Sequence, residues 1–180
     1  SAFAPRVITI TTLPPSADDL LLENQRLKTT QRAEEESAKF LGLLRERAAK
    51  YPGDRLATLV LARAEFRLGD FAKGRALIDA WLEANPKDPE ALRLMGMAMI
   101  DQAHDDGASG QALVDAYKGG SKFLARSFAA DKTNCQTLYY FALAQQTDVG
   151  YPSENTLQVL DIAFNLAPQA DQVRLLYAQA

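Results

Sequence analysis

Residues 55–88 read RLATLVLARAEFRLGDFAKGRALIDAWLEANPKD, and this stretch decides the fold. It holds two segments with apolar residues at helical spacing, separated by the turn Gly69-Asp70-Phe71 and closed by Pro86. We expect Gly69 to lie just past the end of the first helix, where a positive φ costs glycine little. The stretch therefore predicts two antiparallel helices joined by a tight turn.

The same pattern returns along the chain with a period near 34 residues. Pro52 and Pro86 are 34 residues apart, and each follows a helix-period segment that ends in a polar turn, AAKYPGD or LEANPKD. A third turn, AADKTN, places Lys132 where a proline would stand, 46 residues after Pro86, and Pro168 follows 36 residues later. The longer intervals indicate about 12 extra residues near DQAHDDGASGQA and about two in TDVGYPSEN.

This pattern resembles the tetratricopeptide repeat, whose consensus is Trp-x2-Leu-Gly-x2-Tyr on the first helix, Ala-x3-Phe on the second, and then proline. The consensus positions of the best repeat are filled by Leu61, Ala62, Gly74, Ile78 and Pro86. Thr58 and Glu65 depart from the consensus, because they stand in place of its tryptophan and tyrosine. The resemblance implies an all-α fold, an α-α superhelix of stacked antiparallel helix pairs with a concave surface.

We therefore predict a short extended N-terminal segment at residues 1–16 and a helical repeat domain at residues 17–180. Within that domain we expect a long helix or helical hairpin at 17–52, repeats at 55–88, 89–134 and 135–170, and the start of a further repeat at 171–180. The composition agrees, with 30 Ala and 25 Leu against 11 Val plus Ile, a bias that favours helix.

The N-terminal part is less regular than the repeats. The stretch RVITITT, residues 6–12, alternates β-branched residues and is followed by Leu13-Pro14-Pro15, which predicts one strand and a breaker. That strand is either a tail that pairs elsewhere or the end of a sheet in a preceding domain. Residues 20–51 contain no proline and predict one long helix, or two that divide near Lys28-Thr29-Thr30.

Charge and cysteine content limit the classes of function. Lys plus Arg total 20 and Asp plus Glu 23, so a net charge of −3 gives no case for nucleic acid as a partner. No apolar run is long enough to span a bilayer, so we expect no membrane insertion. The single cysteine, Cys135, excludes an internal disulfide, and the compartment stays open between cytoplasm and a bacterial periplasm.

Few residues suggest chemistry. The only histidine, His104, lies in DQAHDDG, where Asp101 and Asp105 would share a helix face and could hold a divalent cation, but an exposed loop of the insertion is the simpler interpretation. Cys135 has no nearby histidine base and is interpreted as a half-buried structural thiol. No nucleophile, phosphate-binding or dinucleotide motif is present. We predict neither enzyme activity, nor a cofactor, nor a metal.

Surface recognition remains as the expected function. In the tetratricopeptide family the inward face of each first helix lines a groove, and this implies the partner-binding candidates Arg63, Phe66, Arg67, Arg93, Met97, Tyr139 and Tyr140. The arginines could clamp carboxylates of a peptide, and the aromatic rings supply apolar area. The alternative is that the rings pack in the core and the arginines are solvated. Trp81 stands where the family usually has alanine and is expected to fill a gap between repeats.

We therefore predict a scaffold that binds a peptide segment or a partner protein through the concave face of a superhelix. The alternative is the scaffold region of a larger enzyme, for example a peptidase, whose catalytic domain lies outside this sequence. Self-association through the half-repeat at 171–180 is compatible with both predictions.

Overall fold

The computed structural model describes residues 34–180, which form α-helices and one 3₁₀ turn and contain no strand. The helices are α2 (Glu34–Lys50), α3 (Arg55–Leu68), α4 (Phe71–Ala84), α5 (Pro89–Asp105), α6 (Gly110–Ala130), α7 (Cys135–Ala144), α8 (Glu154–Leu166) and α9 (Asp171–Gln179), with the 3₁₀ turn η1 (Gln145–Thr147) after α7. The strand expected at 6–12 and the helical segment expected at 17–33 lie outside the described residues.

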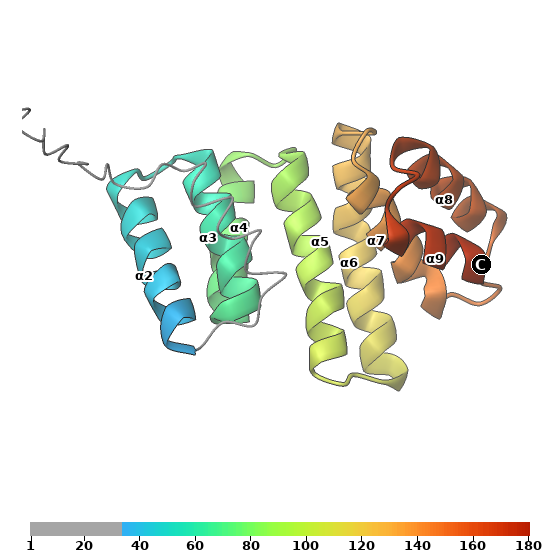
Figure 1. The fold of residues 1–180 in the computed structure, drawn as a ribbon, viewed down its shortest axis with the longest axis horizontal. Coiled ribbons are helices and arrows are strands. Elements are labelled where there is room, and N and C mark those ends of the chain that lie inside the picture. The colour runs from blue at the N-terminus through green and yellow to red at the C-terminus, as the bar shows by residue number, and fades with distance from the viewer. Residues whose placement is uncertain (1–33) are drawn as a thin grey trace, which may run out of the picture.

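The helices stack in chain order, as the colour sequence in Figure 1 shows. Helices α3 and α4, α5 and α6, and α7 and α8 form antiparallel pairs, with α2 packed on α3 at one end and α9 on α8 at the other. The first helices of the pairs also touch across the repeats, α3 against α5, α5 against α7 and α7 against α9. The predicted all-α fold of stacked helix pairs is therefore confirmed.

Short polar side chains begin most of the helices, at the turns that the repeat period marked. Asp54 accepts from the backbone N–H of Ala57 at 2.7 Å, and Asp88 accepts from those of Glu90 and Ala91 at 3.0 and 3.3 Å. These bonds satisfy backbone donors that have no partner inside the helix. Each repeat therefore carries its own start signal.

Glycine permits the closest helix crossing. A Cβ on Gly96 of α5 would lie 2.8 Å from the carbonyl oxygen of Gly120 on α6 and 2.7 Å from Cγ of Leu124. No side chain fits at those distances, so the two backbones can approach only where both residues are glycine. Helices α5 and α6 accordingly form an extensively packed pair, with Leu124 fully buried between them.

The prediction of a positive φ at Gly69 is wrong. Its φ is −119°, so Gly69 does not adopt the left-handed conformation, and the neighbouring side chain leaves no space for a Cβ there. The carboxylate of Glu65 folds back over Gly69, where it accepts from the backbone N–H of Asp70 at 3.3 Å and from Arg45 at 2.7 and 3.0 Å. A Cβ on Gly69 would collide with this carboxylate, which is itself only 2% exposed.

The extra residues of the second repeat lengthen both of its helices. Helix α5 has 17 residues and α6 has 21, against 14 in each of α3 and α4. The longer pair extends beyond its neighbours at the lower edge of Figure 1. His104 is part of the last turn of α5, not of a loop as expected, because the helix continues to Asp105.

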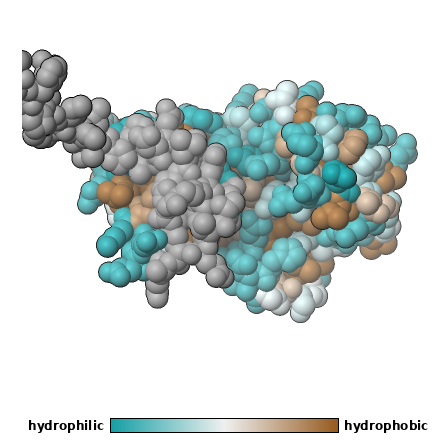
Figure 2. All heavy atoms as spheres, in the orientation of Figure 1, coloured by the Kyte–Doolittle hydropathy of each residue, from teal (hydrophilic) through white to brown (hydrophobic). Residues whose placement is uncertain are grey.

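The core is a chain of clusters between successive helices rather than one centre. One cluster joins α3, α4 and α5 through residues such as Leu59, Ile78 and Met95, with Trp81 packed against it. The indole thus fills space between repeats, as expected. The face drawn in Figure 2 is largely hydrophilic, with apolar atoms showing between the helices. Within residues 34–180, no helix combines the length and hydrophobicity needed to cross a bilayer.

Candidate functional site

Two recesses lie on the side of the molecule formed by the first helices of the pairs. The first, the basic recess, has a volume of about 220 Å³ and is lined by Arg55, Leu56, Leu59, Val60, Arg63, Glu90 and Leu94. The second, the acidic recess, has a volume of about 350 Å³ and is lined by Phe66, Arg67, Ala98, Asp101, Gln102, His104, Asp105 and Tyr140. We call the surface of α3, α5 and α7 that holds both recesses the groove face.

Arg63 is the distinctive group of the basic recess. Its side chain is half-buried beside Leu59 and Leu94, and it forms no hydrogen bond or ion pair with any residue in the described range. Burial, together with the nearby charge of Arg93, lowers the pKa of the Arg63 guanidinium. Glu90 lines the same recess and partly opposes this effect, but both of its carboxylate oxygens accept from Arg93. A half-buried cation without a direct ion pair is electrostatically unfavourable, so this position favours an incoming carboxylate.

Arg93 differs from Arg63 although both belong to first helices. It is 4% exposed, and its guanidinium donates to both carboxylate oxygens of Glu90, to the side-chain oxygen of Gln136 on α7 and, at 3.2 Å, to Sδ of Met97. Its donors are directed to neighbours in the protein. Arg93 therefore ties α5 to α7 beneath the groove face, and Met97 lies beside it.

Aromatic and acidic side chains meet in the acidic recess. The Tyr140 hydroxyl donates to both oxygens of Asp101, at 3.0 and 3.2 Å, and the ring of Tyr139 stands perpendicular to that of Tyr140 with centroids 5.3 Å apart. Burial raises the pKa of Tyr140, so its hydroxyl stays protonated and available as a donor. On the opposite wall Phe66 packs against Phe71 at 5.2 Å between ring centroids.

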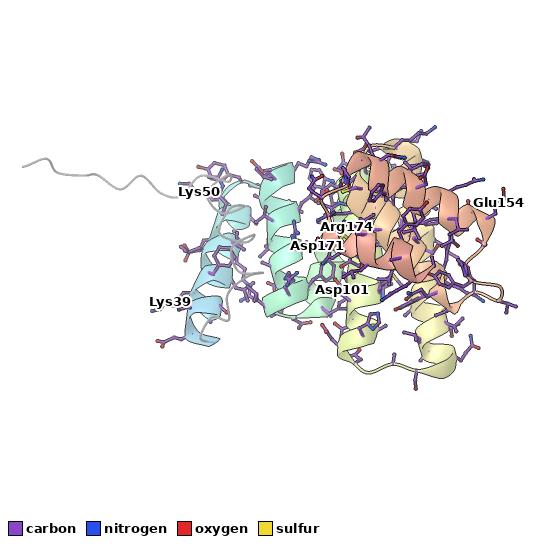
Figure 3. All side chains as sticks on the ribbon, turned by 45° about the vertical axis from the view of Figure 1, so that its right-hand side comes forward. Lys39, Lys50, Asp101, Glu154, Asp171 and Arg174 are labelled. Carbon is purple, nitrogen blue, oxygen red and sulfur yellow. The ribbon has the colours of Figure 1, made fainter. Side chains whose placement is uncertain are left out.

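Asp101 is the carboxylate at the centre of this recess. It projects from α5 on the side toward α3, as Figure 3 shows. The surrounding protein withdraws water from it and raises its pKa, although the Tyr140 hydroxyl and the charge of Arg67 act in the opposite direction. Asp105, one helical turn further, adds a second negative charge to the same wall.

The predicted partner-binding residues thus fall into three positions. Phe66, Arg67 and Tyr140 line the acidic recess, and Arg63 lines the basic recess. Tyr139 packs beside Tyr140, whereas Arg93 and Met97 contact each other beneath the groove face. The sequence suggests either a metal site or an exposed loop for Asp101, His104 and Asp105, and it does not predict their place on the groove face. No group of three or more His, Cys, Asp or Glu residues within 34–180 is placed to hold a metal ion.

The repeat period could have placed Asp101 on the groove face, because Asp101 follows Arg67 of α3 by 34 residues. The insertion could have placed Asp105, because extra residues between two helices can lengthen both, and Asp105 belongs to the last turn of α5, beyond the length of α3. His104 donates to or accepts from the hydroxyl of Tyr117 on α6 and so holds the two long helices together there.

Stacked helix pairs with a recessed inner face define a helical-repeat protein. A family model described as "Tetratricopeptide repeat" matches residues 36–98, which confirms the resemblance found in the sequence. Such a domain supports a general role as a protein-interaction scaffold. No curated protein matches this chain.

Solved structures resemble the whole helical array. The chain superposes with a TM-score of 0.61 on "MamA 41-end from Desulfovibrio magneticus RS-1", at 18% identity over 91% of this chain and 82% of that one. A second structure, "MamA RS-1 ArsTM double mutant", gives the same values. At this identity the likeness concerns the fold alone.

Proposed function

We propose that this protein is a scaffold whose groove face binds a polypeptide segment, with Arg63 pairing a carboxylate of that segment. The observation that carries the proposal is the half-buried Arg63 guanidinium, which lies beside apolar side chains and forms no ion pair among the described residues, since the nearby Glu90 is bonded to Arg93. A peptide can supply an acidic group and an aliphatic side chain together, and both would fit this recess.

The surrounding residues support the same ligand. Leu56, Leu59 and Leu94 offer apolar surface in the basic recess, and Phe66 and Tyr140 offer flat rings further along the groove face. Aromatic rings and arginine are the residue types that contribute most to binding energy in protein interfaces. In this proposal Arg93 positions α7 relative to α5 and does not contact the ligand.

Selection from a displayed library of random peptides on the immobilised full chain tests the proposal. We expect enriched peptides to carry Asp or Glu next to an aliphatic residue. Fluorescence anisotropy with one labelled peptide should show a loss of at least about tenfold in affinity for Arg63→Met, equal to about 1.4 kcal/mol.

Arg75→Met is the matched control, because Arg75 is an exposed arginine on α4, the outer helix of the same pair. It removes the same charge and should leave the affinity unchanged. Equal losses in the two variants, or no enrichment of any peptide, would contradict the proposal.

The alternative that this chain is the scaffold region of a larger enzyme concerns sequence outside it and stays a prediction. Self-association also stays a prediction. Its expected surface is α9, where Leu175 is 63% exposed next to a recess of about 580 Å³ that Phe164 and Tyr177 help to line. Light scattering over a range of concentrations tests it.

A further inference from the structure

The acidic recess differs from the basic recess in its charge and in the side chains that line it. It combines two carboxylates on one face of α5, Asp101 and Asp105, with the aromatic rings of Phe66 and Tyr140. Its volume of about 350 Å³ exceeds what a single long side chain occupies and falls in the range of ligand pockets. The recess is therefore large enough for the end of a lysine or arginine side chain.

The negative charge in this recess is only partly balanced, because Arg67 supplies one positive charge against the carboxylates of Asp101 and Asp105. Arg67 borders the recess, but it forms no ion pair with Asp101, Asp105 or any other residue within 34–180. Tyr140 supplies a hydroxyl donor without a charge. Carboxylates face aromatic rings here. This arrangement suits a guanidinium or ammonium group, which can form an ion pair with the carboxylates and lie against the faces of the rings.

From this arrangement we propose that the acidic recess binds a basic side chain, a guanidinium or an ammonium group, of the polypeptide that occupies the groove face. The inference rests on the proposed function for the source of that side chain. It adds that the ligand carries two opposite charges in a fixed order, an acidic group at Arg63 and a basic group at Asp101 and Asp105. The groove face would thereby select the direction of the bound chain.

Proton linkage follows from the same geometry. The pKa of Asp101 is raised in the free protein, and a cation bound beside it would lower that pKa. The other ionisable groups that face it within residues 34–180 are Asp105 and His104 on α5, Arg67 on α3, Tyr139 and Tyr140 on α7 and Tyr117 on α6. Binding of the cation should therefore strengthen as the pH rises through the pKa of Asp101.

A small cation tests the recess without any peptide. The full chain, labelled with ¹⁵N and ¹³C, is titrated by NMR with n-butylguanidinium chloride, and with n-butylurea as the neutral analogue of the same shape. We expect saturable chemical-shift changes at residues 101–105 and at the Tyr140 ring with n-butylguanidinium but not with n-butylurea. The pKa of the Asp101 carboxyl group, followed through the chemical shift of its carbon, should be lower when the cation is present.

Charge-removing variants localise the effect. Asp101→Asn, which can still accept from Tyr140, and Asp105→Asn should each weaken butylguanidinium binding by about fivefold or more, within the range for a charge-assisted pair. Asp106→Asn is the matched control, because Asp106 is the next residue, is exposed, bonds to Gln102 and does not line the recess. Equal weakening in all three variants would overturn the assignment, as would saturation by butylurea or the absence of saturable shifts.

Arg63→Met separates this inference from the proposed function. It should weaken peptide binding by at least about tenfold while leaving butylguanidinium binding intact. If peptides bind through Arg63 but the cation does not saturate the acidic recess, the further inference fails and the proposed function stands. If the cation binds to the acidic recess but no peptide binds to the groove face, the proposal that a polypeptide supplies the basic group is wrong.

Discussion

Arg55 and Asp88 form a two-point contact between equivalent corners of neighbouring repeats. Nε of Arg55, the first residue of α3, donates to Oδ2 of Asp88 at 2.7 Å, and its terminal nitrogen donates to Oδ1 at 2.8 Å. The same carboxylate begins α5 and accepts from the indole N–H of Trp81 on α4 at 2.9 Å. One side chain therefore connects three helices, and it is only 7% exposed.

Asp88→Ala should destabilise the fold by about 2 kcal/mol, because it removes a helix cap and leaves the indole N–H of Trp81 without its acceptor. Urea unfolding monitored by circular dichroism measures the change. Asp79→Ala is the control, since Asp79 is 52% exposed and its only partner in the described part of the chain, Arg75, is 3.5 Å away. It should change stability by less than about 0.5 kcal/mol, and a similar loss in both variants would contradict the role of Asp88.

The contribution of Asp88 should also depend on pH. Burial opposes its charged form, but the hydrogen bonds from Arg55, Trp81 and the backbone of Ala91 together hold the pKa of Asp88 below its ordinary value of 3.8. A depressed pKa in the folded state gives stability that is present above pH 3.8 and is lost as the pH falls through the folded pKa.

The difference in unfolding free energy between wild type and Asp88→Asn should therefore be constant from about pH 7 to 5 and shrink below about pH 4. Other carboxylates titrate in both proteins, so they cancel in the difference. Urea unfolding at pH 7, 5, 4 and 3 measures it, and a difference that grows toward pH 3 would be inconsistent with a lowered pKa.

Periodic features of the fold could be predicted from the sequence because each repeat carries its own turns. Pro52, Pro86 and Pro168 mark these turns, and helices α3 and α4 lie within the predicted repeat 55–88. The reason for a glycine at position 69 could not be predicted from the repeat pattern. The space beside Gly69 is taken by Glu65, and the position of that carboxylate depends on Arg45 in the preceding helix, a contact between residues 20 apart in sequence.

Gly96→Ala should cost about 1 to 3 kcal/mol, because its Cβ would press on the backbone of Gly120 and on Leu124. Gly42→Ala is the matched control on α2, where no atom of the described residues 34–180 is found within 4 Å of the new Cβ. It should instead stabilise the helix by about 0.5 to 1 kcal/mol. Thermal unfolding of both variants measures these opposite signs, and a stabilised Gly96→Ala protein would refute the close crossing.

The candidate site shows a second limit of sequence-based prediction. Arg63 and Arg93 both lie on the first helix of a repeat, although not at equivalent positions of the 34-residue period, and the sequence predicts partner binding for both. Their difference comes from long-range contacts, since Gln136 is 43 residues from Arg93 and reaches it only in the folded stack. Periodicity identifies the face on which a side chain lies, but not which of two similar side chains is already paired.

This difference predicts opposite effects on stability. Arg63→Met should stabilise the free protein by about 0.5 to 1 kcal/mol, since it replaces a half-buried cation that forms no ion pair among the described residues with a flexible apolar side chain. Arg93→Met should destabilise it by about 1 to 2 kcal/mol, because Glu90 and Gln136 lose their partner.

Urea unfolding of both variants, combined with the anisotropy measurement on the selected peptide, tests this contrast. If the Arg63 charge destabilises the free protein and serves to bind the ligand, its removal should raise the free energy of unfolding and weaken peptide binding. We expect both effects for Arg63→Met. If Arg63→Met destabilises the protein as much as Arg93→Met does, the Arg63 guanidinium has a structural partner, and the reason for assigning it to a ligand no longer holds.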